Sequence, residues 1–157
     1  MRSVLIDSTE KAKVKASLDL SFAAASLNAA GTYKNDPKEP RYDCASFVNI
    51  EATLQGLTGG TLDVTIQDSP DGLTWYDFAR FPQIAAGAAK ATYSYNPTLS
   101  NAIVAIGNPT TDPATPAPGI VANAVRGGHP MSYLRAVAVA GAGASAGVAQ
   151  TIIVNAR

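Results

Sequence analysis

The sequence has one cysteine and one histidine in 157 residues. Cys44 has no partner for an internal disulfide, and with His129 alone beside it there is no Cys/His set for a structural zinc site. His129 lies in the turn-like string RGGHP, and the sequence contains no G-x-S-x-G motif, so a Ser/His/Asp triad is not indicated. We therefore expect no catalytic residue, no metal and no cofactor, and a protein that is not an enzyme.

Net charge and long apolar runs are also lacking. Twelve Lys and Arg residues balance twelve Asp and Glu residues, so no net field attracts nucleic acid or an anionic membrane. The chain has no apolar run of the length that a signal peptide or a membrane span requires. These absences predict a protein made in a cytoplasm, with neither nucleic acid nor membrane as a partner.

Charge is scarce in the second half of what we expect to be a single domain, residues 1–157. Only five of the 24 charged residues follow position 82: Lys90, Asp112, Arg126, Arg135 and Arg157. A surface so poor in charge is badly solvated. We expect that part of this half is covered, either within a core of small residues or by a partner.

Alternation of apolar and polar residues, the pattern of a half-buried strand, runs through much of the chain. It is clearest in residues 13–22 and recurs in residues 42–54, where Cys44 takes the place of a small buried hydrophobe. Further strands are expected at 91–96, 102–107, 120–125, 133–140 and 148–155. The last two are expected to form a hairpin around the glycine-rich string 141–147.

The segment 61–81, TLDVTIQDSPDGLTWYDFARF, predicts a hairpin. Its turn DSPDG has Pro to set φ and Gly to accept a positive φ, so we assign Asp68 and Asp71 to turn chemistry, with a bound cation as the alternative. The expected core of the hairpin consists of Leu62, Val64, Ile66, Trp75 and Phe78. Short strands, frequent turns and no convincing helix together predict an all-β fold. We expect a two-sheet β-sandwich or jelly-roll with an N-terminal arm at 1–12 and long loops at 23–41 and 108–119.

Four stretches carry a resemblance to a known class of proteins: residues 61–64 (TLDV), 69–72 (SPDG), 74–78 (TWYDF) and 133–139 (YLRAVAV). In this order they resemble the small β-sandwich proteins of tailed-bacteriophage virions, most of all capsid decoration or cement proteins. The resemblance implies a structural protein without catalytic residues, located on the capsid surface of a virion. Its implied partner is the major capsid protein, and such proteins often sit as trimers over junctions between capsomers.

Physical reasoning leads to the same class. A cement protein needs a small rigid fold, extended segments that reach neighbours, and surfaces of low charge that become buried as subunits repeat over a lattice. We expect a homo-oligomer, preferably a trimer, with its interface in residues 83–107 or 120–155. The candidate partner contacts are Lys34, Lys38, Arg41, Tyr133, Arg135 and Val137.

Two other function classes stay open at this stage. A carbohydrate-binding module would use exposed aromatics such as Trp75, Tyr76, Tyr93 and Tyr95 as a stacking platform. A tail or fibre module of a virion would be built on the same scaffold as a decoration protein. An enzyme would need a carboxylate pair such as Asp63 and Asp77, but nothing in the hairpin marks a cleft around them.

Overall fold

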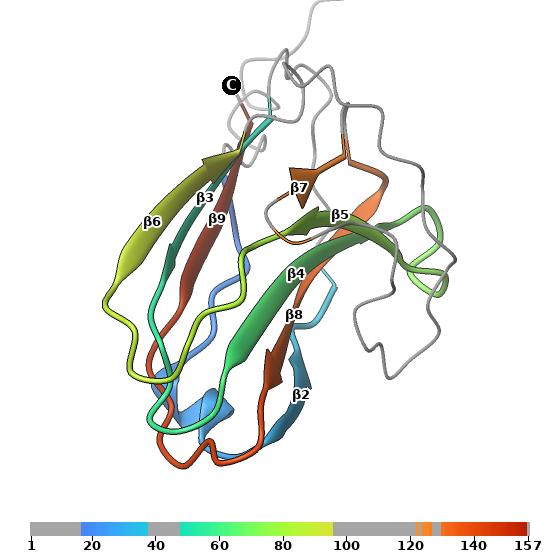
Figure 1. Cartoon of the computed structure of the whole chain (residues 1–157). Coiled ribbons are helices and arrows are strands. Elements are labelled where there is room, and N and C mark those ends of the chain that lie inside the picture. Colours follow the sequence, from blue (N-terminus) through green and yellow to red (C-terminus); the bar gives the residue numbers. More distant parts are fainter. Residues whose placement is uncertain (1–16, 38–47, 96–121, 123, 127–129, 157) are drawn as a thin grey trace, which may run out of the picture.

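The computed structural model describes residues 17–37, 48–95, 122, 124–126 and 130–156. Within these residues the chain forms a four-stranded sheet of order β1-β9-β3-β6 and a five-stranded sheet of order β2-β8-β4-β5-β7, all with antiparallel pairs (Figure 1). The strands are β1 (Ser17–Asp19), β2 (Gly31–Lys34), β3 (Val48–Leu54), β4 (Leu62–Ser69), β5 (Tyr76–Arg80), β6 (Ala91–Tyr95), β7 (Ala124–Val125), β8 (Tyr133–Ala140) and β9 (Thr151–Ala156). The predicted all-β two-sheet sandwich is confirmed.

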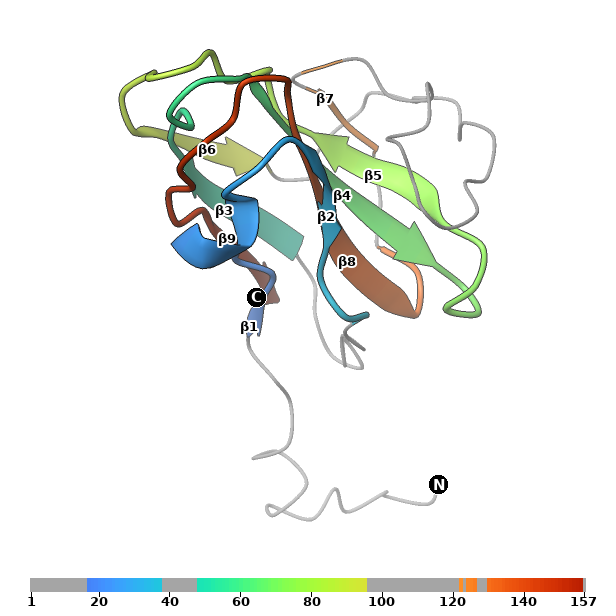
Figure 2. The same ribbon diagram turned by 90° about the horizontal axis from the view of Figure 1, so that it is seen from below.

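The hydrophobic core lies between the two sheets, which form separate layers when seen from below (Figure 2). Alternate residues of each long strand point into it, as the period of two requires. The inward residues are Leu18, Leu20 and Phe22; Ile50, Ala52 and Leu54; Leu62, Val64 and Ile66; Leu134, Ala136, Ala138 and Ala140; and Ile152 and Val154. Of the strand predicted at 13–22, residues 17–19 form β1 and Phe22 forms an isolated bridge with Gln150; of the strand predicted at 42–54, residues 48–54 form β3.

The segment 23–41, predicted as a loop, contains two short elements. A 3-10 helix, η1 (Ala24–Leu27), inserts the fully buried Leu27 into the core, and β2 then pairs with β8. Residues 38–41 of this segment, the arm at 1–12, the loop at 108–119, the strand expected at 102–107 and Cys44 lie outside the described residues.

The predicted hairpin of the last two strands is wrong. β8 lies between β2 and β4 in the five-stranded sheet, whereas β9 lies between β1 and β3 in the other sheet. The glycine-rich connection therefore crosses from one layer to the other. The period of two reports which residues share a face, but it does not identify the neighbouring strand.

The glycine-rich string 141–147 packs against a second one, GLTGG at residues 56–60, and both form turns. The N–H of Ser145 donates to the carbonyl of Thr58 at 3.0 Å, and the N–H of Gly141 donates to that of Thr61 at 2.8 Å. Gly59 has φ +66°, and a Cβ added there would lie 2.1 Å from the carbonyl oxygen of Gly143. The close approach of the two turns thus requires glycine at this position.

The pairing of β4 with β5 contains a bulge. The register shifts between Ile66, which opposes Ala79, and Gln67, which opposes Asp77. Phe78 is the extra residue, and both Phe78 and Ala79 are buried in the core. The bulge lets two consecutive residues of β5 point inward.

Among the described residues, no helix is long and apolar enough to cross a membrane.

Candidate functional site

The tip of the β4–β5 hairpin is held by its own side chains. The Asp71 carboxylate accepts hydrogen bonds from the N–H groups of Leu73 at 2.9 Å and Thr74 at 2.8 Å. Ser69 donates its hydroxyl to Asp71 and accepts the N–H of Gly72, which has φ +76°. The sequence DSPDGLT thus folds into a fixed tip, because a short acid and a hydroxyl satisfy the backbone donors of the turn.

Asp71 serves the turn, as predicted. The N–H groups of Thr74 and Leu73 lower the pKa of its carboxyl from 3.8 to about 2, because they stabilise the charged form. Within the described residues, no three His, Cys, Asp or Glu side chains gather in a way that could hold a metal ion.

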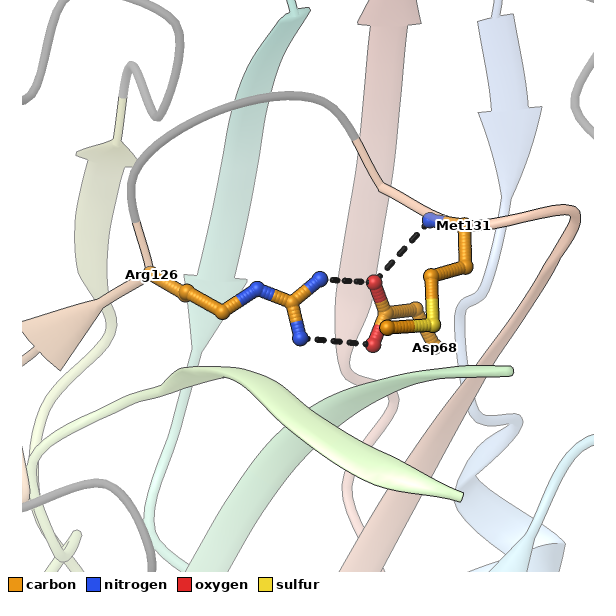
Figure 3. A network of polar contacts seen from close by, with 3 residues as sticks. All are labelled: Asp68, Arg126 and Met131. Carbon is orange, nitrogen blue, oxygen red and sulfur yellow. Dashed lines mark hydrogen bonds and ion pairs between the residues drawn. The ribbon is translucent and has the colours of Figure 1, made fainter. Parts of the chain in front are cut away.

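Asp68 does not serve the turn, which corrects the prediction made for it. Its buried carboxylate accepts hydrogen bonds from both terminal nitrogens of Arg126, one of them at 3.1 Å. It also accepts a hydrogen bond from the N–H of Met131 at 3.0 Å (Figure 3). The guanidinium also lies 5.1 Å from the ring centre of Phe78. Burial raises the pKa of Asp68, against the opposing effect of Arg126. The pair fastens the chain around Arg126 and Met131 to the end of β4.

Sequence reasoning missed the role of Arg126. The available signal was an isolated cation after the apolar string IVANAV, because a charge in such a setting is buried only with a partner of opposite sign.

A buried polar row crosses the outer face of the five-stranded sheet. The guanidinium of Arg135 lies 4.1 Å from the ring centre of Trp75 and donates to the Gln67 side-chain oxygen at 2.8 and 3.0 Å. The Gln67 amide donates in turn to Asp77 at 3.0 Å. Trp75 is 2% exposed and so is buried as expected. It is not part of the core between the sheets, however, because it covers Arg135 on the opposite face.

A groove of about 280 Å³ opens beside this row. Trp75 and Arg135 line it together with Gly72 and Leu73 of the hairpin tip and with the chain that follows β2, namely Lys34, Asn35, Asp36 and Pro37. Leu73 is 78% exposed and is the one large exposed hydrophobic side chain among the described residues. The groove therefore combines an apolar projection with charged groups of both signs.

A second hollow of about 440 Å³ adjoins the groove and shares Lys34, Asn35 and Asp36 with it. Asn35 holds this stretch in place: its N–H donates to Ala136 and its side-chain amide donates to the Ser21 carbonyl, both at 3.1 Å. Both hollows thus follow from the way the chain leaves β2.

The predicted partner contacts meet different outcomes. Lys34 is exposed and lines the groove, and half-buried Tyr133 lies beside Gly72, where an added Cβ would be 3.8 Å from its ring. Arg135 lines the groove but is only 3% exposed, and Val137 is fully buried. Val137 is therefore covered within the chain itself and offers no surface to a second molecule. Lys38 and Arg41 lie outside the described residues.

Three aromatics of the alternative stacking platform, Trp75, Tyr93 and Tyr95, do not come together. Tyr93 and Tyr95 pack on Phe81 with ring centres 5.8 and 5.2 Å apart, on the core side of β6. Burial raises the pKa of Tyr95 to about 12, with a smaller contribution from Tyr93. Trp75 lies on the other sheet's outer face, so these rings cannot share one sugar ring.

The two carboxylates considered for catalysis have separate partners. Asp63 forms an ion pair with Arg80 at 3.6 Å and accepts a hydrogen bond from the Gln83 amide at 2.9 Å, whereas Asp77 accepts one from the amide of Gln67.

Comparison of the chain with family models, with curated proteins and with solved structures found no match. Among the described residues, the groove beside the exposed Leu73 is the candidate binding surface.

Proposed function

We propose that this protein is a structural component of a tailed-bacteriophage virion, a decoration or cement protein that binds the major capsid protein on the outside of the head. The residues that carry the resemblance to such proteins include the SPDG turn and the TWYDF strand. These two stretches build the hairpin tip and one wall of the groove.

The main support for this proposal is the exposed side chain of Leu73. This side chain is 78% exposed, yet the backbone that carries it is fixed by Asp71 and Ser69. An apolar anchor on a rigid support loses little conformational entropy on binding. Trp75 and Arg135 line the groove beside it but are only 2% and 3% exposed, so they shape the groove and leave Leu73 as the anchor. The arrangement suits insertion of Leu73 into an apolar pocket of a protein partner.

The charges around the groove add direction to such a contact. Lys34 and Asp36 lie at its rim, where they would orient a partner of complementary charge without strong net attraction. On a capsid the same contact repeats many times over the lattice, so each single contact can be weak.

A rebinding assay tests the proposal. Virions of the phage that carries this gene are stripped of the protein and incubated with purified parent or variant chains. Leu73→Lys should lose rebinding, because a charge replaces the anchor. Thr151→Lys, which adds the same side chain at an exposed position of the other sheet, should rebind like the parent. Rebinding of Leu73→Lys at the parent level would contradict the assignment of this surface.

A further inference from the structure

The four edge strands of the sandwich differ in how well they are protected against pairing with another chain. Among the described strands the edges are β1, β6, β2 and β7 (Figures 1 and 2). β7 has two residues, β1 has three and includes Asp19, and β2 has four and includes Lys34. Short length and charge are common means of blocking an edge.

The β6 strand has none of these protections. Its five residues, ATYSY, include no charge and no proline, and its pairing with β3 continues without a register shift from Ala91 to Tyr95. Thr92 and Ser94 are exposed on the outer face, and Tyr93 and Tyr95 are half-buried on the core side. A regular uncharged edge of this length is suited to accept a further strand.

We propose that β6 pairs with β6 of a second copy of this chain, antiparallel about a two-fold axis at Tyr93. The choice of partner follows from self-complementarity. An antiparallel pair about a two-fold axis places each residue opposite the one that lies equally far beyond the axis, so the edge has to complement itself. β6 carries no charge, so pairing with its own copy brings no charged group into the contact.

The side chains of β6 also fit this register. With Tyr93 at the axis, Thr92 lies opposite Ser94 of the second copy, which places two hydroxyl pairs on the outer face. Ala91 lies opposite Tyr95 of the second copy, so a small side chain faces a large one at each end. The pair joins two four-stranded sheets into one of eight strands. This two-fold contact differs from the trimer favoured by the sequence, and it does not rest on the function proposed for the groove.

Sedimentation velocity over a concentration series tests the pairing with two matched variants. Thr92→Lys/Ser94→Lys places like charges opposite each other across the axis, so the dimer should be lost. Thr92→Glu/Ser94→Lys places opposite charges there, so the dimer should be retained. Both variants carry the Ser94→Lys change beside Glu51 of the same chain, and both substituted positions are exposed. Circular dichroism confirms that each variant is folded.

The remaining outcomes count against the proposal. A parent chain that stays monomeric at high concentration, or forms trimers, would overturn it. So would a dimer that survives the double lysine variant, because the contact would then lie elsewhere. Loss of the dimer in the Glu/Lys variant would refute the two-fold register. None of these results affects the rebinding assay at Leu73, so the two proposals can fail separately.

Discussion

Replacing Trp75 by alanine tests the buried polar row on the outer face of the five-stranded sheet. The indole is 2% exposed, and the Arg135 guanidinium lies 4.1 Å from its ring centre. Burial of a large apolar side chain contributes about 1.5–3 kcal/mol, and a desolvated cation–π contact contributes about 2 kcal/mol. The sum agrees with the loss of about 3–5 kcal/mol typical of large aromatic-to-alanine changes. Trp75→Ala should therefore remove a large part of a total stability of about 5–15 kcal/mol.

Urea denaturation followed by far-ultraviolet circular dichroism measures this loss. Trp75→Phe is the matched control: it keeps an aromatic ring over Arg135 and should lose clearly less than the alanine variant. The parent has a single tryptophan, so its emission maximum reports on this site and should be that of an indole shielded from water. A loss of unfolding free energy below about 1 kcal/mol in Trp75→Ala would refute the reasoning, because a loss that small is close to the range of surface substitutions. An emission maximum typical of exposed indole would do so as well.

Three further predictions concern the acids and the central strand. Arg126→Met should lower the free energy of unfolding by about 3–5 kcal/mol, because it leaves the Asp68 carboxylate buried without its ion pair. The double variant Arg126→Met/Asp68→Leu should lose much less, because no unpaired charge is left buried. Equal losses in the single and the double variant, measured by urea denaturation, would contradict this. The pKa of Asp71 is lowered from 3.8 to about 2, so its stabilising effect is full above 3.8 and disappears as pH falls through about 2. Asp71→Asn should lack this acid dependence, and an NMR titration of Asp71 with an ordinary pKa would refute the cause. Val137 is fully buried, so Val137→Lys should unfold the domain. A folded monomer by circular dichroism and sedimentation would instead place Val137 at an interface.

Alternation was enough to predict most of the sandwich. Leu62, Val64 and Ile66 are all fully buried on one face of β4, as the period of two required. Alternation could not reveal which strands are neighbours, because pairing depends on contacts between residues far apart in the sequence. β8 and β9 were expected to pair but belong to different sheets.

Local composition was also an incomplete guide in two places. The charges and prolines around 34–41 suggested an uninterrupted loop, but the four residues of β2 gain their hydrogen bonds from β8, which the local sequence cannot show. The scarcity of charge in the second half left two explanations open, a core of small residues and a covering partner. For β8 the first applies: Ala136 faces the core and Val137 is fully buried on the other face.

The candidate site was only partly predictable. The turn residues of the SPDG string and the burial of Trp75 followed from the sequence, since both rest on local chemistry. The groove did not, because it forms where the chain leaving β2 approaches the hairpin tip, and these segments are far apart in the sequence. Asp68 was assigned to the turn for the same reason, since its partner Arg126 is 58 positions away.

Quantitative mass spectrometry of purified virions from the phage that carries this gene distinguishes a decoration protein from a tail or fibre component. It measures the copy number of this protein relative to the major capsid protein. A decoration protein repeats with the capsid lattice, so we expect a copy number in a simple fixed ratio to that of the major capsid protein. Absence from the particle, or a few copies as in a tail tip or fibre, would contradict it.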